Sequence, residues 1–436
     1  MKTLHHPFNI NHQGHLEIGG VDTIDLTKKY GTPLYVYDVS LIRKNARAFV
    51  KTFETLGIQA QIAYASKAFS SIAMVEVANE EGLSLDIVSE GELYTALQAG
   101  FPTERIHMHG NNKSYAELEM AIEHHIGCIV IDNFYEIEMI ASLLEKYDQT
   151  IDVLIRLTPG IESNTHKYIM TGNEDSKFGF NLENGQAEKG IERLLNEQRM
   201  NFKGLHCHIG SQIFETEGFV IAVDTLFSAI EKWKHQFNYI PEVLNLGGGF
   251  GIRYTKEDNP LPYEEYVKTV VQEVEKKVNE IEIPFPEIWM EPGRSIVGEA
   301  GITLYSIGAT KDIPGIREYV SVDGGMSDNL RPALYEAKYE AIIANKATER
   351  IEKTVSIAGK CCESGDMLIW DLEVPEITQG DILAMFSTGA YGYAMANNYN
   401  RIARPAVVFV ENGKDQLVVE RETIQDLVKN DLHYSS

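Results

Sequence analysis

Cysteine, positive charge and long apolar runs are all scarce in this sequence. Its 436 residues contain four cysteines and no Cys-x-x-Cys pair, which excludes a disulfide framework. Lysine and arginine total 39 against 64 aspartates and glutamates, a formal net charge of −25. Such a charge repels phosphate backbones and anionic lipids, so we expect no nucleic-acid and no membrane partner. No apolar run approaches the roughly 18 residues of a membrane span, and residues 1–10 lack the apolar segment of a signal peptide. A cytoplasmic location is therefore expected.

Eight short apolar runs, separated by amphipathic helical patterns, occupy the chain from about residue 35 to residue 295. The runs are 61–66, 83–89, 105–110, 128–132, 152–157, 204–210, 243–249 and 287–293. Each is rich in β-branched residues and is bounded by turn or cap residues, as buried parallel strands are. Eight strands that alternate with helices predict a closed (β/α)8 TIM-like barrel, with an open doubly wound sheet as the alternative.

The pattern changes after residue 300. Short strand-like runs follow one another between Gly, Asp and Pro turns, and no long helical pattern separates them. A separate all-β sandwich or barrel domain is therefore predicted. Residues 1–34 also have extended patterns and are expected to join the same sheet. The predicted domains are a barrel over 35–299 and a β domain formed by 1–34 with 300–436.

Lys67 is the first candidate for chemistry, because it follows the first predicted strand in the segment IAYASKAFS. Most lysines are solvated surface groups. At the C-terminal mouth of a barrel, however, catalytic groups gather, and desolvation there lowers the pKa of an amine, as a Schiff-base lysine requires.

Two glycine-containing segments follow the seventh and eighth predicted strands. The segment GGGFG, residues 247–251, matches neither a Walker loop nor a dinucleotide fingerprint. It is either a tight turn or a nest of backbone amides for a phosphate, since phosphate sites in these barrels follow strands seven and eight. The segment EPGR brings Glu291 and Arg294 to the same corner. Glu291 could there accept a hydrogen bond from a protonated ring nitrogen of a pyridoxal cofactor.

Histidines and cysteines allow further alternatives. In HCHIGSQ, His206 and His208 lie on one face of a predicted strand, which suggests zinc, but no third or fourth ligand stands at a recognised spacing. We therefore expect no metal and keep zinc as an alternative to a histidine ring that packs on a cofactor. In the β domain, GKCCESGD offers vicinal Cys361 and Cys362, one of which could donate a proton.

Seven segments occur in one order: YASKAF, HCHIGSQ, GGGFG, EPGR, SDNLRPALYEA, CCESGD and TGAYGYAMANNYN. Together they resemble the pyridoxal-phosphate decarboxylases of the alanine-racemase-like barrel class, and within that class the diaminopimelate branch. The resemblance runs from about residue 30 to residue 405, and the segment 166–180 resembles the same branch. It implies a barrel with a β-sandwich domain, pyridoxal 5'-phosphate as the cofactor, and a homodimer whose active sites lie at the subunit interface.

The resemblance also implies roles for individual residues. The implied catalytic residues are Lys67, Cys362, His208 and Glu291. The implied cofactor-binding residues are Lys67, His208, Ser211, Gly249, Glu291, Pro292, Gly293, Arg294 and Tyr391. The implied substrate-binding residues are Arg294, Arg331, Tyr335, Glu363 and Tyr391. Lys67 then forms an aldimine with the cofactor, His208 stacks on its ring, and Glu291 pairs with the pyridine nitrogen. Cys362 donates the proton from the neighbouring subunit.

The implied reaction is decarboxylation of meso-2,6-diaminopimelate to L-lysine and carbon dioxide, the last step of lysine biosynthesis. Arg294 or Arg331 could bind the distal carboxylate of this small amino-acid substrate. Relatives acting on ornithine or arginine typically have Asp where this chain has Glu363, and alanine racemases pair the ring nitrogen with Arg.

Other functions stay open as alternatives. One is decarboxylation of another diamino acid, of the ornithine, lysine, arginine or carboxynorspermidine type. A non-catalytic relative should have lost the Schiff-base lysine or the proton donor, and this chain has both. Many relatives have His where this chain has Cys361, and Glu363 sets the register that makes Cys362 the expected donor.

Overall fold

The computed structural model describes residues 6–160 and 176–434 and divides the chain into two compact units. Unit 1 comprises Met1–Arg43, Arg253–Asn259 and Ile296–Ser436, and unit 2 comprises Lys44–Ile252 and Pro260–Ser295. Residues 35–43, 253–259 and 296–299, expected in the barrel domain, thus group with unit 1. Most of the segment 166–180 lies outside the described residues.

Unit 2 is a closed parallel barrel, as predicted. Its described residues contribute eight barrel strands, each paired in parallel with the next, and the last pairs with the first to close the ring. In barrel order they are β5 (Ala60–Ala65), β6 (Ser84–Ile87), β7 (Ile106–Met108), β8 (Cys128–Ile131), β9 (Ile151–Thr158), β11 (Met200–Cys207), β12 (Val243–Asn245) and β13 (Glu287–Met290). The short β10 (Phe180–Asn181) pairs with β9 outside this ring. All eight predicted runs correspond to barrel strands.

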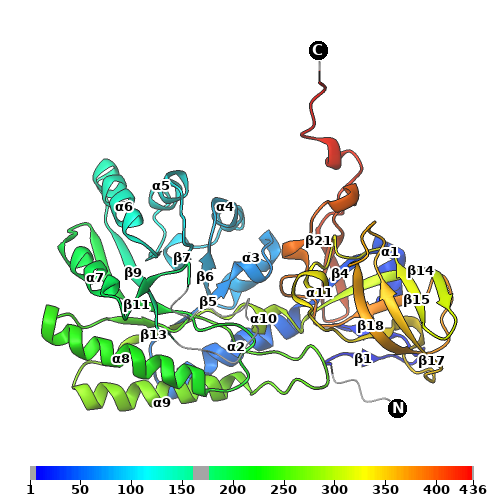
Figure 1. The fold of residues 1–436 in the computed structure, drawn as a ribbon, viewed down its shortest axis with the longest axis horizontal. Coiled ribbons are helices and arrows are strands. Elements are labelled where there is room, and N and C mark those ends of the chain that lie inside the picture. The colour runs from blue at the N-terminus through cyan, green and yellow to red at the C-terminus, as the bar shows by residue number, and fades with distance from the viewer. Residues whose placement is uncertain (1–5, 161–175, 435–436) are drawn as a thin grey trace. The chain divides into compact units, whose positions relative to one another are not determined.

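Helices surround the ring of strands and alternate with them along the chain (Figure 1). They are α2 (Val39–Leu56), α3 (Ile72–Glu80), α4 (Glu90–Gln98), α5 (Tyr115–Glu123), α6 (Phe134–Tyr147), α7 (Gln186–Asn196), α8 (Glu217–Phe237) and α9 (Tyr263–Ile281). Side chains of Ser71, Ser89, Ser114 and Asn133 accept backbone N–H groups at the starts of α3 to α6. These caps satisfy amides that the helix leaves unpaired, so each helix begins at a defined residue close to the strand before it.

Unit 1 is built mainly from β-strands, as predicted. Its large sheet contains β4 (Leu34–Asp38), β14 (Gly301–Ile313), β15 (Arg317–Val322), β16 (Ala341–Ile343), β17 (Lys353–Ala358), β18 (Met367–Val374), β19 (Ile382–Met385), β20 (Ala406–Glu411) and β21 (Lys414–Val419). Strand β4 lies between β14, with which it pairs antiparallel, and β20, with which it pairs parallel. The short helix α11 (Arg331–Tyr335) and the four-residue α10 (Arg294–Val297) complete the elements needed below.

The N-terminal segment differs in part from its prediction. Strands β1 (Asn9–Ile10), β2 (Leu16–Ile18) and β3 (Val21–Asp22) form a small sheet of their own instead of joining the large one. Residues expected to be extended form the helix α1 (Thr23–Tyr30), because the Asp22 side chain accepts the amide of Ile24 and Leu26 is buried. Only β4 from this segment joins the large sheet.

Among the described residues, no helix is both long enough and apolar enough to span a membrane.

Candidate active site

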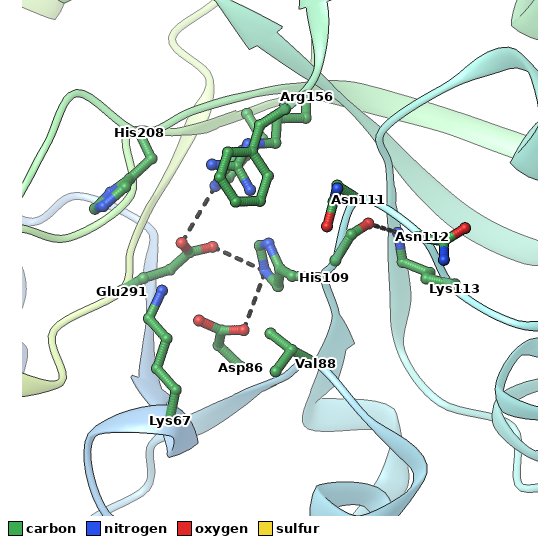
Figure 2. A pocket seen from close by; sticks show the side chains of 13 residues that line it. Lys67, Asp86, Val88, His109, Asn111, Asn112, Lys113, Arg156, His208 and Glu291 are labelled. Atoms are coloured by element: carbon green, nitrogen blue, oxygen red, sulfur yellow. Dashed lines mark hydrogen bonds and ion pairs between the residues drawn. The ribbon is translucent and has the colours of Figure 1, made fainter. Parts of the chain in front are cut away.

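A cavity of about 350 Å³ opens among the carboxyl ends of the barrel strands (Figure 2). Its lining side chains come from seven places in the chain, and most stand at or just after a strand end. They include Lys67, Asp86, His109, Arg156, His206, His208 and Glu291. The C-terminal face is where barrel enzymes hold catalytic groups, because loops that follow different strands meet there.

Glu291 is the most heavily contacted acid of this cavity. Its Oε1 accepts a hydrogen bond from Asn245 Nδ2 at 2.6 Å and lies 3.0 Å from His109 Nε2. Its Oε2 lies 3.2 Å from His206 Nε2. Burial raises the pKa of this carboxyl, but His109 and His206 outweigh burial and hold the pKa well below its usual range. Glu291 is therefore a buried, ionised carboxylate.

His206 and His208 are both neutral. Burial lowers the pKa of His206 to about 4 despite its contact with Glu291. Burial, with help from Lys67, also holds the pKa of His208 well below its usual range. The amide of Gly248 donates to Nδ1 of His208 at 3.3 Å, which fixes the orientation of that ring.

Lys67 reaches the cavity from the one-turn 3₁₀ helix η1 (Ser66–Ala68), directly after β5. Figure 2 shows its side chain extending toward Glu291. The predicted Schiff-base lysine and the predicted partner of a ring nitrogen therefore line the same cavity.

The predicted phosphate segments are joined by one backbone and one side-chain hydrogen bond at one corner of the barrel. Ile213 donates to the carbonyl of Gly249 at 2.9 Å, and Arg294 Nη2 donates to Ser211 Oγ at 3.0 Å. A Cβ on Gly249, where φ is +101°, would lie 2.3 Å from the Gly210 carbonyl. Only glycine fits there, so the chain can follow this path and a ligand can approach its backbone closely.

The remaining residues of the EPGR segment tie this corner to the first strand. The carbonyl of Pro292 accepts the amide of Ala65, and a Cβ on Gly293 would lie 2.9 Å from the Ala65 side chain. The predicted residues of the barrel therefore occupy one region, between β5, β11, β12 and β13.

Unit 1 holds the other predicted residues. Arg331, in α11, is buried, donates to Tyr339 Oη at 2.5 Å and lies over the ring of Tyr254 at 4.8 Å. Burial lowers the pKa of this guanidinium, but Tyr254, Tyr339 and Tyr391 together raise it. Tyr335, at the end of α11, is exposed.

The turn that carries Cys362 and Glu363 is fixed by one carboxylate. Asp366 Oδ2 accepts the amide of Cys361 at 2.8 Å, and its Oδ1 accepts the amide of Met326 at 2.6 Å. The Cys361 thiol is buried, whereas Cys362 is exposed, and the Cys362 amide donates to Asn400 at 2.7 Å. Of the two cysteines, only Cys362 is thus placed to reach a ligand outside its own unit.

Known proteins match almost the whole chain. The family model "Pyridoxal-dependent decarboxylase, pyridoxal binding domain" matches residues 39–298. The diaminopimelate decarboxylase of Bacillus methanolicus is 64% identical over 418 residues, with 96% of this chain and 97% of the relative covered. That of Bacillus subtilis (strain 168) is 61% identical over 433 residues, with 99% of each covered. The chain belongs to the diaminopimelate decarboxylase family.

Solved structures of the diaminopimelate decarboxylase family have the same fold. The diaminopimelate decarboxylase of M. jannaschii in complex with L-lysine is 34% identical, covers 98% of both chains and has a TM-score of 0.92. The Helicobacter pylori structure, also with L-lysine, is 28% identical and covers 94% of this chain and 98% of its own, with a TM-score of 0.85.

The cavity residues fit the pyridoxal cofactor of the diaminopimelate decarboxylase family. A buried, ionised carboxylate can accept the N–H of a protonated pyridine ring, and Lys67 offers an amine in the same cavity. The glycine corner with Ser211 and Arg294 presents hydroxyl, guanidinium and backbone donors suited to a phosphate.

Sequence reasoning missed four polar residues at this site. Asp86 lies in β6, Arg156 in β9 and Asn245 at the end of β12, and His109 follows β7. Their common signal is a polar side chain at the carboxyl end of an otherwise apolar barrel strand, which is where this fold gathers chemistry.

The zinc alternative rested on His206 and His208. Among the described residues, the group with metal-like spacing is instead His109, His206 and Glu291, whose ligand atoms lie within 4.8 Å of one another. The contacts of 3.0 and 3.2 Å to Glu291 account for this spacing without an ion.

Proposed function

We propose that this chain decarboxylates meso-2,6-diaminopimelate to L-lysine and carbon dioxide, with pyridoxal 5'-phosphate as its cofactor. The observation that carries the proposal is the presence of Lys67 and the buried, ionised Glu291 in one cavity at the barrel mouth. Similarity to the diaminopimelate decarboxylases over nearly the whole chain supports the choice of substrate.

Bound pyridoxal phosphate supplies an electron sink for the pair of electrons that the departing carboxylate leaves behind. The Lys67 amine would hold the cofactor covalently, and it is the group that the substrate amine would replace. Glu291 keeps a proton on the ring nitrogen, because an ionised, buried carboxylate favours the protonated partner. His208, neutral and fixed by the Gly248 amide, offers a flat face on which the ring can rest.

The phosphate group is held at the glycine corner. Ser211 and Arg294 donate side-chain hydrogen bonds, and the backbone of Gly249 and Gly293 allows the group to approach closely. Pro292 holds this segment against the end of β5.

Substrate recognition and the final proton transfer use unit 1. Cys362, on the turn fixed by Asp366, donates the proton to the α-carbon, and Glu363 and Tyr335 contact the distal end of the substrate. Arg331, with Arg294, binds carboxylate oxygens, while Tyr391 contacts both cofactor and substrate. We propose that Cys362 serves the site of the second subunit in a homodimer, and that the enzyme is cytoplasmic.

The test compares substrates on the purified protein reconstituted with pyridoxal phosphate. Wild type should release carbon dioxide and lysine from meso-diaminopimelate, and little gas from ornithine, lysine, arginine or carboxynorspermidine. Lys67→Ala should abolish turnover and the absorbance of the covalently bound cofactor, whereas Lys203→Ala, on the barrel surface, should change neither. Preference for one of the other diamino acids would refute the substrate assignment.

A mixing experiment tests the shared site. Lys67→Ala and Cys362→Ala protein should each be inactive. After subunit exchange, half of the dimers would be mixed and each would have one complete site, so about a quarter of wild-type activity should return. If no activity returns although exchange is shown by differently tagged chains, Cys362 does not act across subunits.

A further inference from the structure

Two buried carboxylates share one imidazole at the base of the cavity. His109 Nε2 lies 3.0 Å from Glu291 Oε1 and 3.7 Å from Asp86 Oδ1, and all three side chains are buried (Figure 2). Two buried carboxylates this close to one another ionise together only with a nearby cation, because burial and mutual repulsion each favour the protonated acid.

The two histidines that contact Glu291 differ in their surroundings. His206 faces this one carboxylate, and burial prevails, so that its pKa falls to about 4. His109 faces Asp86 as well, and the two acids together outweigh burial and raise its pKa. Burial thus dominates at His206, on one side of Glu291, whereas the two acids dominate at His109, on the other.

The remaining charged groups around His109 do not replace it. The titratable groups around it include His107 (β7), Asp86 (β6), Arg156 (β9), His206 (β11) and Glu291 (after β13). Glu92 and Asp132 also interact with His109, and Lys67 acts on Asp86. The Lys67 amine, however, is the group proposed to hold the cofactor. Burial makes His107 neutral, with a pKa of about 3. Arg156 Nε lies 3.9 Å from Asp132 Oδ1, and its guanidinium lies 4.3 Å from the centre of the Phe178 ring. Its ion pair is therefore with Asp132.

The backbone holds His109 in this place. Its amide donates to the carbonyl of Ile87 at 2.8 Å. One residue later, the carbonyl of Gly110 accepts a hydrogen bond from the buried Lys113 amine at 2.7 Å. The imidazole therefore stands on a fixed segment and not on a free loop.

We infer that His109 is a positioning residue: as an imidazolium between Asp86 and Glu291, it keeps Glu291 ionised and oriented for the ring nitrogen of the cofactor. The inference rests on the proposed function and adds a residue to it. Without this cation one proton would be shared by the two carboxylates. A protonated Glu291 cannot accept the N–H of a pyridinium ring, so the electron sink would weaken.

Neutron diffraction from crystals of the wild-type holoenzyme at pH 8 tests the protonation directly and needs no substitution. We expect deuterium on both ring nitrogens of His109, and on Nε2 alone of His206. Deuterium on a single nitrogen of His109 would overturn the inference, as would a zinc ion bound by His109 in the purified protein.

Cofactor affinity, measured by equilibrium dialysis of the holoenzyme, tests the role. His109→Gln keeps a donor but removes the charge, and should weaken pyridoxal phosphate binding about 10- to 100-fold, the effect of one charge-assisted contact. His206→Gln replaces one neutral donor by another and is the matched control with a smaller loss.

The double variant Asp86→Asn, His109→Gln separates charge from structure. Removing the competing carboxylate should restore part of the affinity lost in His109→Gln. Equal losses for His109→Gln and His206→Gln, without recovery in the double variant, would show a structural role and overturn the inference. Failure of the wild-type protein itself to bind pyridoxal phosphate would instead refute the proposed function, and the inference with it.

Discussion

Replacing Lys113 by methionine should destabilise the barrel more than any surface substitution. The Lys113 amine donates to the carbonyls of Gly110 and Val130, each at 2.7 Å, and to Glu136 Oε2 at 2.9 Å. Both side chains of the pair are 1% exposed. Burial lowers the pKa of Lys113 and raises that of Glu136, so each charge depends on the other.

The expected magnitude follows from the charge left behind. Breaking a buried ion pair by removing one partner costs about 3–5 kcal/mol, because the remaining charge stays buried. A unit the size of unit 2 loses roughly 2–4 °C of melting temperature per kcal/mol. Lys113→Met should therefore lower the melting temperature of the holoenzyme by about 6–20 °C.

Differential scanning calorimetry and urea unfolding measure this loss of stability, and two further variants serve as controls. Lys113→Met, Glu136→Gln removes the stranded charge but keeps an acceptor for the Asp132 amide, which Glu136 normally bonds at 2.9 Å, so part of the stability should return. Lys203→Met breaks an exposed pair and should change stability by less than about 1 kcal/mol. A loss in Lys113→Met no larger than in Lys203→Met, or no recovery in the double variant, would refute the reasoning.

Three further predictions concern catalysis, packing and pH. Cys362→Ala should lower kcat about 100-fold or more, whereas the buried neighbour in Cys361→Ala should cost far less, and equal losses in steady-state assays would contradict the assignment of the donor. Gly248→Ala would place a Cβ 2.1 Å from the main-chain oxygen of Glu291, so cofactor affinity in equilibrium dialysis should fall. Gly91→Ala, whose Cβ would lie 3.8 Å from the Ser89 hydroxyl, at ordinary van der Waals distance, should leave it unchanged. Burial raises the pKa of Asp328 to about 7, so the folded chain holds this proton more tightly than the unfolded chain. That stabilisation is complete below about pH 4 and is lost as the pH rises through 7, so between pH 5 and 8 wild type should lose about 2–3 kcal/mol more than Asp328→Asn in urea unfolding. If the free energies of unfolding of wild type and Asp328→Asn change equally with pH, this prediction is refuted.

The barrel was predictable because its strands are largely buried on both faces and contain short apolar runs at regular intervals along the chain. The interior is filled by side chains from those same runs, such as Val130, Leu154 and Trp289. Strand pairing outside the barrel was harder to predict. The residues of α1 form a helix because the Asp22 side chain caps it and Leu26 is buried. Neither feature is strong enough in the sequence to predict a helix between two segments with extended patterns.

The candidate site was predictable only where residue type and neighbours were both distinctive. Lys67 and Glu291 stand in segments whose glycine, proline and small residues mark a strand end at a binding face. Asp86 is a polar residue in a short strand and His109 directly follows the next one, and their importance depends on a 3.7 Å approach between the two side chains. The order of residues along the chain does not show that these two side chains approach each other across neighbouring strands.

The position of β4 in the large sheet has a consequence for synthesis. Its partners β14 and β20 begin at Gly301 and Ala406, so the ribosome makes the whole barrel between β4 and the strands that cover it. At about 5–20 residues per second, the apolar LYVYD segment waits roughly 20 s to more than a minute for its second neighbour. An unpaired apolar strand is a template for pairing with other chains. Early folding of the barrel does not shorten this exposure, so the nascent chain should depend on chaperones that bind its first forty residues.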